Sequence, residues 1–159
     1  MVQDKIRILF VCHGNICRSP MAEFVMKQKV AQAGVSHRFH IESAATSSEE
    51  LGNPVYPPVR ELMRRLGIPF DRDKRARKLL ASDYDDFDHI IGMDEYNRRN
   101  MQRICMCDYD GKISLLMDFT AHPRSVADPW YTDEYEKAWR DIDEGCDALL
   151  RHLLAQIRH

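Results

Sequence analysis

The sequence predicts an α/β protein in which helices cover both faces of an open, mostly parallel sheet, a three-layer sandwich. Short apolar runs, typical of buried parallel strands, alternate along the chain with segments of helical spacing. The chain has 159 residues, of which 44% are hydrophobic and 30% charged, which suits one core. Because no internal repeat or linker interrupts it, residues 1–159 are expected to form a single domain.

The first predicted strand and helix lie close to the N-terminus. Residues 6–11 form a nearly continuous apolar run, which predicts a buried strand. Apolar residues then recur at helical spacing over residues 21–33, with Pro20 in the first turn and Gly34 at the far end. A helix is therefore expected there.

The rest of the chain repeats this alternation of strand and helix. Further apolar runs predict strands, and further segments of helical spacing predict helices. The strands are expected at residues 39–41, 88–93 and 112–117, and the helices at residues 55–66, 94–106 and 132–157. This order favours parallel pairing, because a helix between two strands returns the chain to the same end of the sheet.

The charge and the cysteines limit the classes of function. The formal net charge of −2 and the isoelectric point near 6.4 provide no basic field, so neither a nucleic-acid nor a membrane partner is expected. The N-terminal apolar run is too short for a secretory signal or a membrane span. The five cysteines, an odd number, argue against a secreted disulfide framework, so a cytoplasmic location is expected.

The segment between the first strand and the first helix, residues 12–19, carries the chemistry. A helix N-terminus at this place offers unpaired N–H groups and a positive partial charge to an anion. Five residues separate Cys12 from Arg18, enough for the backbone to curl round inorganic phosphate or another oxyanion, and Gly14 permits the tight backbone. Arg18 offers a fork to two phosphate oxygens, and the same field favours the thiolate form of Cys12.

A cysteine and an arginine at this spacing are, by themselves, more simply explained as a buried small residue and a surface charge. Here a strand precedes Cys12, and Arg18, Ser19 and Pro20 open a helix. Few structural loops meet these requirements together. Cys12 is therefore the expected nucleophile and Arg18 the expected phosphate clamp.

Residues 11–23, Val-Cys-His-Gly-Asn-Ile-Cys-Arg-Ser-Pro-Met-Ala-Glu, resemble the signature of the low-molecular-weight protein tyrosine phosphatases. The resemblance extends through residues 42–46, 76–77 and 127–131. It implies a four-stranded parallel sheet of flavodoxin-like order 2-1-3-4. It also implies hydrolysis of tyrosine-phosphorylated proteins through a cysteinyl phosphate, without metal or other cofactor. The implied phosphate-binding residues of the loop are His13, Gly14, Asn15, Ile16, Cys17, Arg18 and Ser19.

The resemblance also assigns roles after the last strand. The departing tyrosyl oxygen needs a proton, which a thiolate cannot supply. Asp128 is implied to be this general acid, and then the base that activates water, on a loop that Pro129 restrains. Trp130 and Tyr131 are implied to wall the cleft, although an aromatic pair before a helix is equally compatible with core packing.

Other residues match supporting positions of the family. Asn15, Ser19 and Ser43 match positions that hold the loop in a strained shape and stabilise the thiolate, although Ser19 is also explained as a helix-start residue. Cys17 matches a second loop cysteine that can trap the oxidised nucleophile as a disulfide, with buried packing as the alternative.

The sequence departs from the family pattern at four positions, which leaves the substrate preference open. His13 replaces a small or aliphatic residue, and Lys74 stands where a histidine often precedes the Ala-Arg pair. Glu49 and Glu50 occupy the region where many relatives place an aromatic wall. An acidic rim would discourage acidic phosphopeptides and tolerate basic ones.

Three other functions share parts of this pattern. An arsenate reductase would need two further cysteines for its relay, for which Cys105 and Cys107 are the candidates. A module that binds phosphate without turnover is disfavoured because a nucleophile, a clamp and Asp128 are all present. A protein-arginine phosphatase would use the same mechanism, but Ile16 stands where that class carries threonine and offers a guanidinium no hydrogen-bond acceptor.

Overall fold

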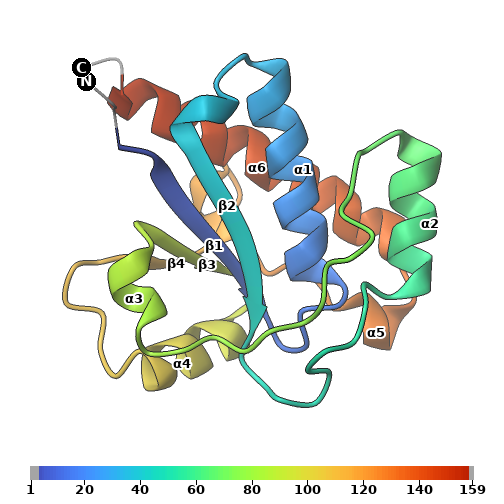
Figure 1. Ribbon diagram of the computed structural model, residues 1–159, viewed down its shortest axis with the longest axis horizontal. Helices are drawn as coiled ribbons and strands as arrows, with labels where there is room; N and C mark the ends of the chain where they lie inside the picture. Colours follow the sequence, from blue (N-terminus) through green and yellow to red (C-terminus); the bar gives the residue numbers. More distant parts are fainter. Residues whose placement is uncertain (1–3, 158–159) are drawn as a thin grey trace.

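A computed structural model of the protein describes residues 4–157, so residues 1–3 and 158–159 of the expected domain lie outside the described part. Its centre is a four-stranded parallel sheet of order β2-β1-β3-β4 (Figure 1). The strands are β1 (Ile6–Cys12), β2 (Phe39–Ala45), β3 (His89–Gly92) and β4 (Ile113–Leu115). The predicted fold class and strand order are confirmed.

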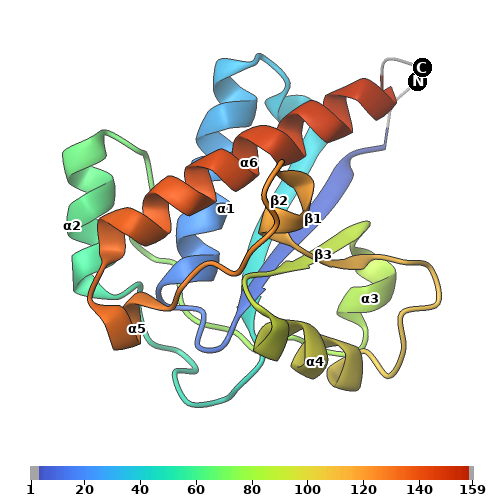
Figure 2. The same ribbon diagram turned by 180° about the vertical axis from the view of Figure 1, so that it is seen from behind.

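Helices connect the strands and cover both faces of the sheet (Figures 1 and 2). In the part of the chain that the structure describes, they are α1 (Arg18–Gln32), η1 (Ser36–Arg38), α2 (Pro57–Leu66), α3 (Asp83–Asp86), α4 (Glu95–Ile104), η2 (Leu116–Phe119), α5 (Pro129–Thr132) and α6 (Tyr135–Ile157). Figure 2 shows the long α6 passing across α1, which it contacts. The four-residue α3 and α5 are too short for a periodic sequence signal.

The two faces of β1 pack into two separate cores. Ile8 and Phe10 belong to the core that contains α1, α2 and α6, whereas Leu9 and Val11 belong to the core that contains α3 and α4. All four side chains are fully buried, because successive side chains of a strand point to opposite faces and both faces are covered. Burying each such side chain contributes roughly 1.5–3 kcal/mol.

One boundary near the expected loop differs from the prediction. The second strand continues to Ala45 rather than ending at residue 41, because Ser43 and the residues after it pair with the end of β1. Small residues have weak strand propensity, so the partner strand decides here. The expectation that Arg18, Ser19 and Pro20 open the first helix is confirmed, because α1 begins at Arg18.

The prediction of one final helix over residues 132–157 is wrong at its start. Pro129 opens the separate helix α5, which ends at Thr132. Asp133 then takes a left-handed conformation with φ 59°, and α6 begins only at Tyr135. Since the left-handed conformation cannot continue a right-handed helix, the chain turns at this residue.

Gly145 allows α6 to approach η2 closely. A Cβ at this position would lie 2.6 Å from Leu116 Cγ and 3.0 Å from Met117 Sδ. We expect Gly145→Ala to lower the free energy of unfolding by about 1–3 kcal/mol, because the overpacking outweighs alanine's better helix propensity. Urea unfolding followed by circular dichroism measures this change. Arg151→Ala, at an exposed position of the same helix, should change stability by less than about 0.5 kcal/mol, and a more stable Gly145→Ala variant would contradict the close approach.

Candidate active site

A pocket opens at the carboxyl end of the sheet, where parallel α/β proteins bind ligands. Its walls come from the loop after β1, the loop after β2 and the start of α5. The lining residues are Cys12, His13, Gly14, Ile16, Cys17, Arg18, Glu49, Glu50, Asp128, Trp130 and Tyr131. Of the site residues expected from the sequence, only Asn15, Ser19 and Ser43 do not line the pocket, and all three are buried.

The strained residue of the loop is Asn15. Its φ of 59° is left-handed, a conformation that asparagine tolerates better than most residues, and its side chain is buried. Gly14, expected to permit the tight backbone, has no positive φ, so the left-handed position of the loop is Asn15 and not the glycine. Gly14 instead gives room to the neighbouring loop, because a Cβ there would lie 3.3 Å from Glu50 Cγ.

The thiol of Cys12 lies at the floor of this loop, next to the N-terminus of α1. Its Sγ is 3.0 Å from Ser19 Oγ and 3.4 Å from the Ser19 backbone nitrogen. Cys17, which precedes α1, provides no side-chain cap, so the first amides of the helix remain available to an anion. The helix N-terminus therefore faces the place where an oxyanion would bind beside Cys12.

The guanidinium of Arg18 is buried, and groups outside the signature loop accept hydrogen bonds from it. Its Nη1 donates to Asp94 Oδ2 at 2.7 Å and to the Val126 carbonyl at 2.8 Å. Burial alone would lower the pKa of Arg18, but the charges of Cys12 and Asp94 outweigh it and raise that pKa above its usual value. Arg18 therefore stays charged and fixed in direction.

Sequence reasoning missed Asp94. It lies two residues after the carboxyl end of β3 at Gly92, and this position in a parallel sheet was the signal that could have found it. Its other oxygen caps α4 by accepting from the Asn97 backbone at 2.7 Å.

Asp128 lies across the pocket from the signature loop, immediately before α5. Its Oδ1 accepts from the Trp130 backbone at 3.1 Å, and its Oδ2 is 3.4 Å from Arg18 Nη2. The segment before it is anchored to the end of β3, because the Val126 backbone donates to the Met93 carbonyl at 2.9 Å. The structure thus brings Cys12, Arg18 and Asp128 together, although the last two are 110 positions apart in the sequence.

Comparison with known proteins agrees with this geometry. The family model of the low molecular weight phosphotyrosine protein phosphatases matches residues 7–159. The chain belongs to this family. It is 37% identical to the low molecular weight protein-tyrosine-phosphatase YfkJ of Bacillus subtilis over 91% of this chain and 94% of that protein. The predicted enzyme class, a protein tyrosine phosphatase, is confirmed.

Solved structures of the family superpose closely on this chain. The crystal structure of YfkJ has a TM-score of 0.91 and 35% identity, covering 97% of this chain and 98% of that one. The low molecular weight protein tyrosine phosphatase SP-PTP of Streptococcus pyogenes has a TM-score of 0.84 and 38% identity, covering 93% of each chain. A Drosophila arginine phosphatase is also similar, with a TM-score of 0.83 and 26% identity over 93% of this chain and 98% of that one.

In this member of the family, the aromatic pair after the acid lies at the surface. Trp130 is 53% exposed and Tyr131 is 84% exposed, so core packing does not explain them. Trp130 meets Tyr56 edge-on at 5.2 Å between ring centroids, and Tyr56 in turn stacks on Tyr135 at 6.3 Å. The cleft wall on this side is therefore aromatic, and the ring of Trp130 packs against that of Tyr56.

The opposite rim of this phosphatase is acidic. Glu49 Oε2 lies 3.0 Å from Nε2 of His13, whose ring also lies near Tyr96. Glu50 accepts a hydrogen bond from Asn53 at 2.6 Å. Of the departures noted in the sequence, His13, Glu49 and Glu50 thus meet in the pocket lining, whereas Lys74 lies outside it.

The other cysteines are poorly suited to a relay with Cys12. Burial, reinforced by the charge of Cys12, raises the pKa of Cys17 well above its ordinary value, and burial raises that of Cys105 to about 11. Neither Cys105 nor Cys107 lines the pocket. The site therefore gives no support to the reductase alternative.

Among residues 4–157, no group of three or more histidine, cysteine, aspartate or glutamate side chains is placed to hold a metal ion. In the same residues, no helix is long and apolar enough to cross a membrane.

Proposed function

We propose that this protein removes phosphate from phosphotyrosine in protein substrates, with Cys12 as nucleophile, Arg18 as clamp and Asp128 as proton donor. The observation that supports it best is the shared pocket, in which a buried thiol, a fixed guanidinium and a carboxylate face one oxyanion-sized loop. The loop amides and Arg18 stabilise the charge on the transferring phosphoryl group.

The first step forms a bond between sulfur and phosphorus. The Cys12 thiolate attacks phosphorus, the bond to the tyrosyl oxygen breaks, and Asp128 gives that oxygen its proton. In the second step, the Asp128 carboxylate takes a proton from water, whose oxygen attacks phosphorus. The sulfur–phosphorus bond then breaks, which releases phosphate and restores the thiolate.

We also propose that residues 1–159 act as one domain, since the two cores together draw on elements from β1 to α6. The loop binds inorganic phosphate and other oxyanions as well as substrate. The protein works in the cytoplasm, where the thiols at positions 12, 17, 105, 107 and 146 stay reduced.

Substrate class depends on Ile16, a buried residue of the pocket wall. Its alkyl side chain favours a phenyl ring over a guanidinium, which would lose its hydrogen-bond partners there. We expect kcat/KM for a phosphotyrosine peptide to exceed that for the matched phosphoarginine peptide. We also expect Ile16→Thr to shift this ratio towards phosphoarginine by about 10- to 200-fold.

Steady-state hydrolysis of the two peptides, side by side, tests both the function and the residue. Ile16→Val, which keeps an apolar wall, is the matched control and should retain the preference for phosphotyrosine. Faster hydrolysis of phosphoarginine by the wild-type protein would make it an arginine phosphatase with the same cysteine mechanism.

A further inference from the structure

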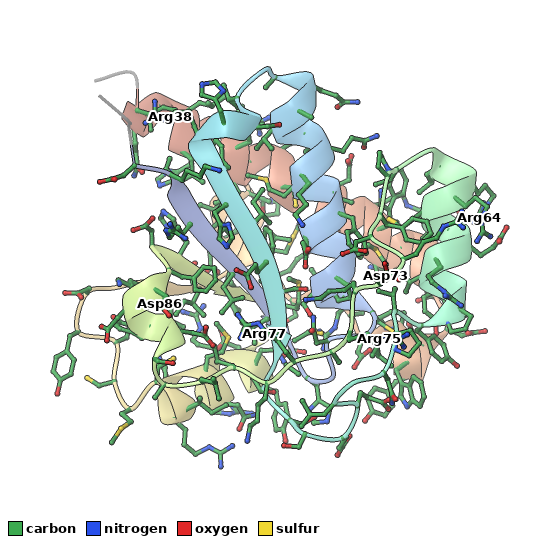
Figure 3. The ribbon with its side chains drawn as sticks, in the orientation of Figure 1. Arg38, Arg64, Asp73, Arg75, Arg77 and Asp86 are labelled. Carbon is green, nitrogen blue, oxygen red and sulfur yellow. The ribbon has the colours of Figure 1, made fainter. Side chains whose placement is uncertain are left out.

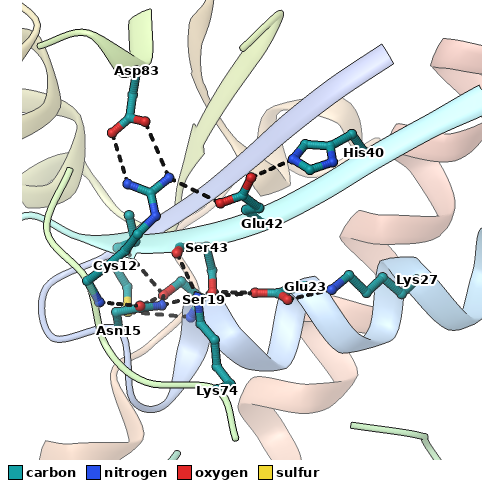
Figure 4. A network of polar contacts seen from close by, with 12 residues as sticks. Cys12, Asn15, Ser19, Glu23, Lys27, His40, Glu42, Ser43, Lys74 and Asp83 are labelled. Atoms are coloured by element: carbon teal, nitrogen blue, oxygen red, sulfur yellow. Dashed lines mark hydrogen bonds and ion pairs between the residues drawn. The ribbon is translucent and has the colours of Figure 1, made fainter. Parts of the chain in front are cut away.

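The sulfur of Cys12 ends a chain of hydrogen bonds that runs under the loop to a buried carboxylate (Figure 4). Asn15 Nδ2 donates to Ser19 Oγ at 2.8 Å and to Ser43 Oγ at 2.9 Å. Ser43 Oγ donates to Glu23 Oε1 at 2.6 Å, and Ser19 Oγ lies 3.0 Å from the sulfur. All five residues are at most 4% exposed, so protein partners rather than solvent set the direction of each proton.

The direction of this chain is fixed at Asn15. Its Oδ1 accepts from the Arg77 backbone nitrogen at 3.2 Å, and a backbone N–H can only donate. The amide nitrogen must therefore face both serines. Since Ser19 Oγ already accepts from Asn15, its own proton is free for Cys12 Sγ, with the Ala44 carbonyl as a more distant acceptor at 3.4 Å.

The far end of the chain is fixed by an ion pair. Lys27 Nζ lies 2.7 Å from Glu23 Oε2, and Lys74 Nζ lies 3.6 Å from Glu23 Oε1 while donating to the Ser43 carbonyl at 2.9 Å. A charged carboxylate only accepts and an ammonium only donates, so neither group can reverse its role. Lys74 can thus only donate hydrogen bonds at this position, whereas a histidine could both donate and accept.

Other charges surround this end of the chain. Arg77, whose side chain is labelled in Figure 3 beside the end of β2, pairs with Asp83 at 3.1 Å and with Glu42 at 3.4 Å. Burial lowers the pKa of Lys74 and the charge of Arg77 lowers it further, whereas Glu23 opposes both. Glu23, and with it Glu42, therefore favours the charged, donating form of Lys74.

We propose that Glu23, together with Lys74, is a positioning residue for Cys12: by holding the proton of Ser43, it keeps the chain in the one direction in which Ser19 donates to the sulfur. The inference rests on the proposed role of Cys12 as nucleophile. A glutamine amide at position 23 can instead donate to Ser43 Oγ. The hydroxyl proton of Ser43 is then free to point towards Asn15. Asn15 can accept that proton only by turning its oxygen towards the serines, after which Ser19 donates to Asn15 and no longer stabilises the thiolate.

The rate at which iodoacetamide alkylates Cys12, measured from pH 4 to pH 9 with the site assigned by mass spectrometry, tests this role. We expect Glu23→Gln to move the curve to higher pH by about one unit, so that alkylation at low pH is about tenfold slower while the plateau at high pH is kept. The control is Glu61→Gln, the same exchange at an exposed glutamate of α2, which should leave the curve in place.

Lys74→Met provides an independent variant if Glu23→Gln does not fold, and it should move the curve in the same direction. An unmoved curve in the folded variants, or an equal loss of rate at every pH, would leave Glu23 as a structural residue and overturn the inference. Because alkylation requires no turnover, absence of phosphatase activity would count against the proposed function alone.

Discussion

Replacing Cys12 with serine is expected to lower kcat for phosphotyrosine by ~10⁴-fold or more. The serine hydroxyl stays protonated in a site that stabilises a thiolate, so no effective nucleophile remains. The loop amides and Arg18 are retained, so phosphate and vanadate should still bind. Steady-state kinetics measures the loss, and isothermal calorimetry measures oxyanion binding.

Cys107→Ser is the matched control, because Cys107 is only partly buried and does not line the pocket. It should keep wild-type kinetics. A Cys12→Ser protein with activity within tenfold of wild type would remove Cys12 from the nucleophile role. Loss of oxyanion binding together with activity would instead indicate a collapsed loop.

Asp128→Asn should slow hydrolysis of phosphotyrosine by about 10²–10⁴-fold, because the tyrosyl oxygen departs poorly without a proton. An activated aryl phosphate, such as p-nitrophenyl phosphate, has a leaving oxygen that barely needs one. The rate at which its phosphoryl group is transferred to Cys12 should therefore fall much less. Measuring the release of the phenol before steady state isolates this first step from hydrolysis of the cysteinyl phosphate.

The control for this exchange is Asp133→Asn, which alters a neighbouring aspartate outside the pocket lining. Asparagine tolerates the left-handed φ of 59° at that position, so both structure and rate should be retained. If the two substrates lose rate equally in Asp128→Asn, that carboxylate acts on the structure of the loop and is not the acid.

The predicted fold followed from features that are local in the chain. Residues 8–11 of the first apolar run are buried on both faces because helices cover both, and such a strand needs no partner information to be recognised. The loop from Cys12 to Arg18 was equally accessible, because its nucleophile, its clamp and its helix start are close in sequence. Asp128 was found through the resemblance, since nothing local distinguishes it from an ordinary Asp-Pro turn.

The α/β class and the oxyanion loop therefore follow from the sequence alone. The groups that act on that loop from a distance are set by how the chain folds. Asp94 and the Val126 carbonyl aim Arg18, and Glu23 and Lys74 direct the chain that ends at Cys12. The physical reason is that charge and hydrogen bonding depend on separation in space, and the carboxyl ends of parallel strands bring together residues that lie far apart in sequence.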